Sequence, residues 1–334
     1  MGAGGRIRDR KEDRDRVRVI ERVQGYFESR YRGLGGERTV YFEEFCIGHY
    51  MEAEDKILSK EIERVKELGI CYRDWEFSLY FYRVLVRCDR AWVRLRENHR
   101  VVFKNTLDTV SEMKGMLHSL TLKKISNEWY ITSHRYWDEL SEGLMRRRFF
   151  AGQRPDWLCP PYNKENLPVL GLKAYDRDAA VQYAHLWALD RNPKYYDFEN
   201  LGGDCTNFCS QVLHAGGCPM NNTKEVGWYY YSLNNRTPSW TGVEFFYRFI
   251  TNNRGIGPKS REVSPREIEL GDVIQLDFPY NAPFNHCLIV VANPEPGNIN
   301  RILISCHTVD RDNYPLVYYN WRAIRYLHII GYGR

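Results

Sequence analysis

The chain has 334 residues, 43% of them hydrophobic, which suits two domains with apolar cores and excludes a fully disordered protein. The longest uninterrupted apolar run, residues 287–292, is far shorter than a membrane span, so we expect no membrane-spanning helix. No apolar stretch follows the charged first residues, so we also expect no secretory signal. Together with nine dispersed cysteines, this predicts reduced thiols and a cytoplasmic protein.

The net charge of +5 is confined to the first half of the chain. Residues 170–334 hold 16 basic and 16 acidic side chains, so the whole excess lies in residues 1–169. Acidic and basic residues are interleaved in residues 10–16, which is typical of a solvated helix face and not of a phosphate-binding stripe. We therefore expect no nucleic-acid partner.

The first 150 residues have the pattern of helices followed by strands. Helical spacing of apolar residues covers residues 17–32 and 52–68. Alternating patterns then predict strands over residues 83–87, 91–96, 100–104, 118–124 and 128–133. This order predicts an α+β accessory domain over residues 1–150, and it loosely resembles the cone-shaped nuclear-transport-factor-like fold.

A proline-rich stretch, residues 151–170, separates this region from a second one and is interpreted as a linker. Beyond it, we expect a helix over residues 178–190 with Asp176 as its N-cap, and a second helix that begins near Cys205. Strands are expected over residues 272–276, 286–291, 301–307 and 325–330. Residues 171–334 therefore form a second α+β domain in this prediction.

The segment from Leu201 to Gly217 (LGGDCTNFCSQVLHAGG) carries the clearest chemical signal. Gly202 and Gly203 permit a tight turn, Asp204 is a good helix cap, and Cys205 then occupies the first helical position. Free backbone amides at a helix start favour a thiolate and can hold a developing oxyanion, so we expect a lowered pKa for Cys205. The alternative is that Cys205 is a small buried core residue.

A partner base would favour the catalytic interpretation. His286 opens an apolar strand after a turn-rich stretch, where it can face a helix packed on the sheet. A third group that fixes the imidazole is expected one strand later, where His307, Asp310, Asp312 and Asn313 lie.

These motifs, with WYYY, PSWTGV, GDVIQLD, NHCLIV and SCHTVD downstream, resemble the putative amidase domain family of bacteria over residues 175–330. That family is similar to papain-like cysteine peptidases and to NlpC-type and CHAP-type cell-wall amidases. The resemblance implies a papain-like fold, a nucleophile at Cys205, a general base at His286 and an orienting residue at His307. Asp310 and Asn313 stay open for the third role, because papain uses an asparagine there.

The resemblance leaves two points open. Papain's oxyanion glutamine has no match, since Glu199 and Asn200 stand in that region, so the second oxyanion donor is unassigned. In related enzymes the acid beside the cysteine can meet a substrate amine, which makes Asp204 a candidate substrate-binding residue.

Trp228 and Trp240 are either core residues or part of a substrate groove. Zinc binding by the cysteines and histidines is the rival chemistry, but the paired short knuckles of structural zinc sites are missing. We expect no metal and no other cofactor.

The sequence thus predicts a cysteine hydrolase of amide bonds that acts on a peptide or a peptidoglycan-derived substrate through a thioacyl intermediate. A non-catalytic binding protein with the same fold and an acyltransferase are the alternatives. The pattern says nothing about the oligomeric state.

Overall fold

The computed structural model describes residues 3–36, 44–104, 108–136, 171–278 and 284–334. The chain divides into two compact units, Met1–Met145 and Arg146–Arg334. The expected linker, residues 151–170, lies outside the described residues. None of the described helices is long and apolar enough to cross a membrane.

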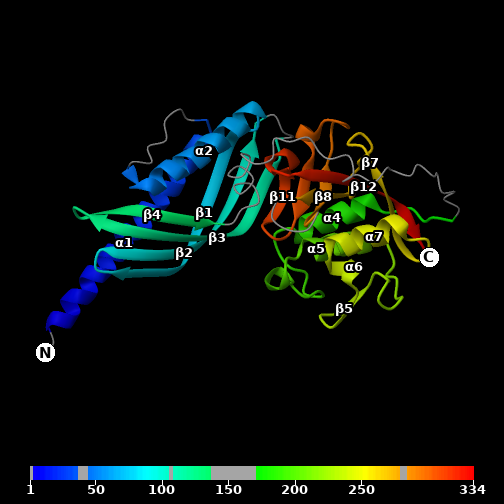
Figure 1. Ribbon diagram of the computed structural model, residues 1–334, viewed down its shortest axis with the longest axis horizontal. Helices are drawn as coiled ribbons and strands as arrows, with labels where there is room; N and C mark the ends of the chain where they lie inside the picture. Colours follow the sequence, from blue (N-terminus) through cyan, green and yellow to red (C-terminus); the bar gives the residue numbers. More distant parts are fainter. Residues whose placement is uncertain (1–2, 37–43, 105–107, 137–170, 279–283) are drawn as a thin grey trace. The chain divides into compact units, whose positions relative to one another are not determined.

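The first unit is a four-stranded antiparallel sheet with two helices. Helix α1 (Ala3–Leu34) and helix α2 (His49–Glu67) precede strands β1 (Tyr72–Arg87), β2 (Arg90–Phe103), β3 (Val110–Ile125) and β4 (Glu128–Tyr136). The strands pair in chain order, as Figure 1 shows in cyan and green. Strict alternation of buried and exposed residues along β2 gives the sheet one packed face and one open face.

The sequence patterns underestimated the strands of this unit. Residues 91–96 and 100–104, expected as two strands, belong to one strand, β2, because its alternation continues through Glu97 and His99. These two polar residues are buried, and Tyr31 of α1 contacts both: its hydroxyl lies 2.5 Å from Glu97 Oε1 and 2.6 Å from His99 Nδ1. Glu97 and His99 are buried because they take part in a hydrogen-bond network, and a search for alternating apolar residues does not recognise such polar positions as part of a strand.

The second unit begins with helices and ends with a sheet. Helix α4 (Arg177–Trp187), the short 3₁₀ helix η3 (Glu199–Leu201) and helix α5 (Cys205–Ala215) come first. Asp176 caps α4 as predicted, since its carboxylate accepts a hydrogen bond from the amide of Ala179 at 2.9 Å. A small hairpin follows, β5 (Tyr230–Ser232) with β6 (Asn235–Arg236), and then helices α6 (Pro238–Thr241) and α7 (Val243–Asn252).

Six antiparallel strands form the sheet of this unit in the order β11-β10-β9-β8-β12-β7. Their bounds are β7 (Gly257–Val263), β8 (Val273–Asp277), β9 (His286–Ala292), β10 (Leu303–Cys306), β11 (Asp310–Pro315) and β12 (Ala323–Gly333). Two 3₁₀ helices, η4 (Ile299–Arg301) and η5 (Leu316–Tyr318), lie between strands. The predicted α+β class is confirmed, whereas the papain-like and cone-shaped assignments stay predictions.

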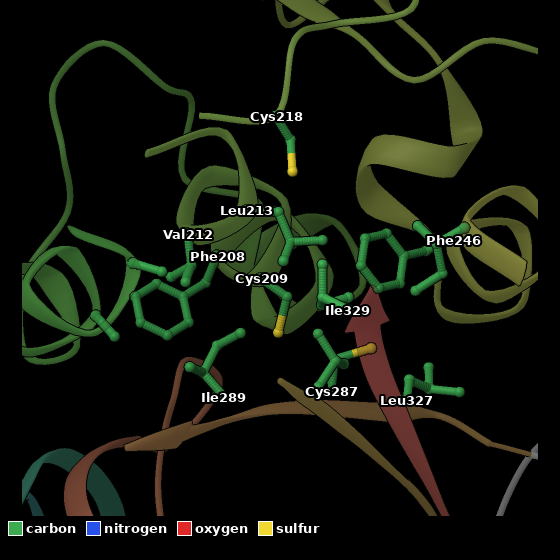
Figure 2. Packing of buried hydrophobic residues seen from close by; sticks show 14 of the residues in the cluster. Phe208, Cys209, Val212, Leu213, Cys218, Phe246, Cys287, Ile289, Leu327 and Ile329 are labelled. Carbon is green, nitrogen blue, oxygen red and sulfur yellow. The ribbon is translucent and has the colours of Figure 1, made fainter. Parts of the chain in front are cut away.

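Helix α5 is the centre of the core of the second unit. Its apolar side chains face the sheet, where they meet residues of β9 and β12 (Figure 2). The residues labelled there from α5 are Phe208, Cys209, Val212 and Leu213, and those from the sheet are Cys287, Ile289, Leu327 and Ile329. Burial of this helix at its very first residue fixes the position of Cys205 against the start of β9.

Candidate active site

The turn before α5 needs its two glycines. Gly202 has φ 111° and Gly203 has φ 105°, a left-handed region that side chains rarely enter. A Cβ at Gly203 would also lie 3.3 Å from the Thr308 hydroxyl. The sequence motif therefore makes a sharp entry into α5, and this entry places Cys205 at the helix start as predicted.

Asp204 does not cap the helix with its side chain, and this expectation was wrong. The carboxylate is completely buried and turns away from the first-turn amides. Its Oδ1 accepts hydrogen bonds from the Phe198 amide and from Asn207 Nδ2, both at 2.9 Å. Its Oδ2 lies 2.5 Å from Nδ1 of His307. With both oxygens engaged inside the protein, Asp204 does not present a free carboxylate to a substrate amine in this arrangement.

The imidazole of His286 lies near enough to the thiol of Cys205 to lower the pKa of that thiol. Both residues are nearly enclosed, with exposed fractions of 7% for Cys205 and 2% for His286. His286 is the first residue of β9 and pairs in register with Leu276 of β8. The structure thus brings together the nucleophile and the base that were predicted 81 positions apart.

The pKa of Cys205 lies well above its ordinary value, opposite to the predicted direction. A hydrogen bond with the Cys287 thiol raises it most, burial raises it further, and the hydrogen bond and charge of His286 lower it. The correction has a physical cause: desolvation at the buried helix start outweighs the favourable amides. The resting form of this residue at neutral pH is therefore a thiol.

Two aromatic rings flank the imidazole of His286. The ring centroids of Phe278 and Tyr319 lie 5.7 and 5.9 Å from it. The Tyr319 hydroxyl in turn accepts a hydrogen bond from the fully buried Arg311 at 2.8 Å. Neither Phe278 nor Tyr319 was singled out from the sequence, because an aromatic residue near a strand end reads as ordinary core.

His307 is held away from a role as partner of His286. Its Nε2 lies 2.8 Å from the carbonyl oxygen of Trp187, and its Nδ1 meets Asp204. A carbonyl only accepts, so Nε2 donates to it. The ring also stacks on Phe208 of α5, with centroids 4.2 Å apart. His307 therefore ties β10 to the start of α5.

Asp310, the second candidate for the third role, belongs to a different pair. Both its oxygens bind the guanidinium of Arg191, each at 2.9 Å. Arg191 also lies 3.6 Å from Asp204, so it links the two carboxylates. Arg191 was missed from the sequence, where a single arginine after a helix carries no signal. Asn313, the third candidate, lies in β11 with φ 52°.

Glu199 lies six residues before the cysteine, in the region where papain carries its oxyanion glutamine. Burial raises the pKa of its carboxyl to about 7, Arg191 lowers it, and neighbouring carboxylates, Asp310 first, raise it. Its Oε2 is enclosed and has no hydrogen-bond partner among the described residues. The second oxyanion donor stays unassigned.

Trp228 and Trp240, the two candidate substrate-binding tryptophans, are completely buried. The Trp228 indole donates to the Ser210 hydroxyl at 3.0 Å, and the Trp240 indole donates to Asn207 Oδ1 at 2.9 Å. Their rings lie 4.6 Å apart. The two tryptophans therefore form hydrogen bonds with polar residues of α5, which fits their interpretation as core residues.

Cys287 lies beside the candidate nucleophile. Its sulfur receives hydrogen bonds from the Gln275 amide at 3.1 Å and from the Thr206 hydroxyl at 3.5 Å. Each of the eight cysteines in the described ranges is a free thiol. Within these ranges, no group of three or more His, Cys, Asp or Glu side chains is arranged to hold a metal ion.

The chain is similar to two curated proteins of Bacillus subtilis (strain 168). The chain is 38% identical over 138 residues to "Uncharacterized protein YhbB" of Bacillus subtilis (strain 168), covering 41% of this chain and 42% of that protein. It is 28% identical over 163 residues to "Uncharacterized protein YjcM" of the same organism, covering 47% and 36%. The matched part thus spans about two fifths of the length of these relatives.

The crystal structure of the intermembrane space region of chloroplast protein ARC6 aligns with a TM-score of 0.28 and 16% identity, over 35% of this chain and 92% of that one. A similarity of this size identifies neither fold nor function. Residues 174–330 match the family model described as "Putative amidase domain", which suggests an amide hydrolase.

Proposed function

We propose that residues 171–334 form a cysteine-dependent hydrolase of amide bonds, with Cys205 as nucleophile and His286 as general base. The observation that carries this proposal is that Cys205, the first residue of α5, and His286, the first residue of β9, are both buried and lie near each other, so that His286 lowers the pKa of the thiol. The match of residues 174–330 to an amidase family supports the same class of reaction. A thiol, a base within hydrogen-bond reach and free helix-start amides are the parts that acyl transfer needs.

In this mechanism the proton leaves Cys205 as the sulfur attacks. His286 takes the thiol proton, and Sγ bonds to the substrate carbonyl carbon, whose oxygen becomes an oxyanion held by the Cys205 amide. Collapse breaks the carbon–nitrogen bond, and His286 returns its proton to the leaving amine. Water then attacks the thioester with His286 as base, which releases the acid and restores the thiol. The raised pKa of Cys205 suits this order, because the ion pair forms only during attack.

Aromatic packing helps to position His286 in this proposal. The rings of Phe278 and Tyr319 restrict the imidazole, and Arg311 holds the Tyr319 hydroxyl. The pair of Asp204 and His307 acts one step further away, by fixing the start of the nucleophile helix. These five residues are positioning residues in the proposal, since they act through Cys205 or His286.

A peptide is the substrate class that we propose, with a peptide derived from peptidoglycan as its first example, and the cytoplasm as the compartment. The substrate class rests on the resemblance described for residues 175–330, and the compartment rests on the nine dispersed cysteines. An acyltransferase would use the same thioester but pass the acyl group to an amine instead of water. A binding protein would use neither step.

The proposal is tested by hydrolysis of a panel of peptide amides and muropeptides, read by mass spectrometry. Cys205→Ser should abolish release of the amine, whereas Cys209→Ser, one turn along the same buried helix, should keep most of it. Full activity in Cys205→Ser would exclude the cysteine mechanism. Amide products formed only with added amines would identify the acyltransferase, and no turnover by any variant would favour the binding protein.

A further inference from the structure

The open face of the sheet in the first unit carries a dense group of cations. Seven exposed residues make up this group, which we call the cationic face: Arg83, Arg87, Arg90, Arg94, Arg96, Lys123 and Arg135. The opposite face of the sheet packs on α1, where Phe27 contacts His118 and Tyr26 contacts His134. The cationic face is therefore the side of β1–β4 that neither α1 nor α2 covers (Figure 1).

Strand register places these cations directly opposite one another. Arg83 of β1 pairs with Arg94 of β2, in a row that continues through Ser119 to Arg135. At the hairpin end, Arg87 pairs with Arg90, and Arg90 pairs with Lys123. Like charges directly opposite on a sheet are destabilising. A fold that keeps three such pairs on one open face holds an arrangement that its own stability does not favour.

Compensating carboxylates lie at the other end of the same sheet. Arg100, on the same face of β2, forms an ion pair with Glu112 at 2.7 Å, and Arg73 pairs with Asp108. Within the described strands, the rows that contain the cationic face hold no carboxylate. Asp89, in the turn between β1 and β2, is the nearest acidic residue along the chain. The positive charge is therefore concentrated rather than neutralised.

Exposed aromatic side chains lie among the arginines. Trp92 stands between Arg90 and Arg94 on the same face of β2 and is 40% exposed. Tyr80 pairs with Arg96 and is 67% exposed. Arginine forks match phosphate oxygens, and open aromatic faces on a sheet stack unpaired bases. Arginines and aromatic side chains alternate on this sheet, as phosphates and bases alternate along a single-stranded nucleic acid.

We propose that the cationic face binds single-stranded nucleic acid, with its arginines on phosphates and Trp92 and Tyr80 against bases. This revises the expectation of no nucleic-acid partner, which came from the interleaved charges of residues 10–16 and took no account of strand register. From Arg90 to Arg96 the face spans about 20 Å along β2, enough for a few nucleotides. The proposal is independent of the amidase chemistry of the second unit.

The test is binding of the full chain to a fluorescent 12-nucleotide single-stranded RNA, followed by anisotropy at several salt concentrations. If the protein contacts about four phosphates, the logarithm of the binding constant should fall with the logarithm of the salt concentration with a slope of about −3. Arg83→Gln with Arg94→Gln should weaken binding about tenfold or more and flatten the slope. Arg100→Gln, a neutralisation on the same face of β2 but within an ion pair, is the matched control and should change little.

Base stacking is tested separately from charge. Trp92→Ala should weaken RNA binding about fivefold or more, Trp92→Phe should recover it, and neither should alter binding of inorganic polyphosphate. Equal affinity of wild type and Trp92→Ala for RNA would overturn the nucleic-acid assignment and leave a general polyanion surface. Tighter binding to anionic lipid vesicles than to RNA, or an equal effect of Arg100→Gln, would overturn it as well.

Discussion

The carboxylate of Asp204 lies 2.5 Å from Nδ1 of His307, and both residues are buried. The residue before the candidate nucleophile is thus paired with the residue that was expected to orient the base. Since Nε2 of His307 is occupied by the Trp187 carbonyl, this imidazole fixes the entry to α5 and not the ring of His286.

Removal of His307 should therefore affect stability first. His307→Ala leaves the Asp204 carboxylate buried without its main partner, which should lower the free energy of unfolding by about 3 kcal/mol. Chemical denaturation of the full chain measures this. The double variant of His307→Ala with Asp204→Asn should lose less free energy of unfolding than the sum of the two single variants. The reason is that the double variant leaves no unpaired buried charge. Unchanged stability with a large loss of kcat would instead restore the orienting role of His307.

Arg191 and Asp310 should behave as one unit. Asp310→Ala and Arg191→Ala should each reduce stability and raise the KM more than they lower kcat, because their bidentate pair shapes the loop before α5. A double-mutant cycle should give a coupling of about 1 kcal/mol. If Asp310→Ala alone abolished turnover while Arg191→Ala did not, Asp310 would be the third catalytic residue.

Thiol labelling should follow exposure and pKa rather than the helix start alone. Cys88 is the exposed cysteine among those described, so iodoacetamide at neutral pH should modify it before Cys205. In a Cys88→Ser background, labelling of Cys205 should accelerate steadily as pH rises above neutrality, because its raised pKa keeps the thiolate scarce. His286→Ala should slow this labelling further by removing the group that lowers the pKa. Faster labelling in His286→Ala would contradict the pairing.

The first unit should lose stability in acid. Burial lowers the pKa of His134 well below its ordinary value of 6.5, helped by the charges of His118 and Arg30. The neutral ring therefore stabilises the fold above pH 6.5, and the unfolded chain gains protons as pH falls below it. Each such proton changes the free energy of unfolding by at most about 1.4 kcal/mol per pH unit.

Glu97 adds a second loss at lower pH, since its pKa is about 2. Its burial would raise this value, but hydrogen bonding and charge from His118 lower it more. Its contribution is complete above pH 4.5 and disappears as pH falls towards 2. After correction for the intrinsic pH dependence of amide exchange, the protection factors of β2 and β3 peptides should fall from pH 7 to 5, and His134→Gln should reduce that fall. An identical pH response in His134→Gln would remove His134 as its cause.

The parts of the fold that the sequence predicted are those with a strong local signal. The glycine pair and Asp204 mark the start of α5, and the apolar run after His286 marks β9. Helix α7 and strands β7 and β11 were missed. Strand β11 (Asp310–Pro315) contains charged residues, so its sequence does not look like a buried strand. It is nevertheless mostly buried, and its Arg311 packs between the rings of Tyr314 and Tyr319.

The candidate site was predicted as a pair but not as a network. Cys205 and His286 each follow a turn that the sequence reveals, so their positions could be inferred. The partners of His307 and Asp310 depend on where Trp187, the last residue of α4, and Arg191, in the loop beyond it, lie, and no local pattern encodes these positions. The direction of the Cys205 pKa also failed, because Cys287 approaches from another element.

The most direct test of the account is intact-protein mass spectrometry of acid-quenched reactions with a peptide amide substrate. The account predicts an acyl adduct on Cys205 that hydroxylamine removes, that persists in Cys209→Ser and that is missing from Cys205→Ser. In His286→Ala its formation should slow by at least about a hundredfold, the contribution of a general base. Hydrolysis of the same amide with the acyl group on a residue other than Cys205, or with full rate in Cys205→Ser, would contradict it.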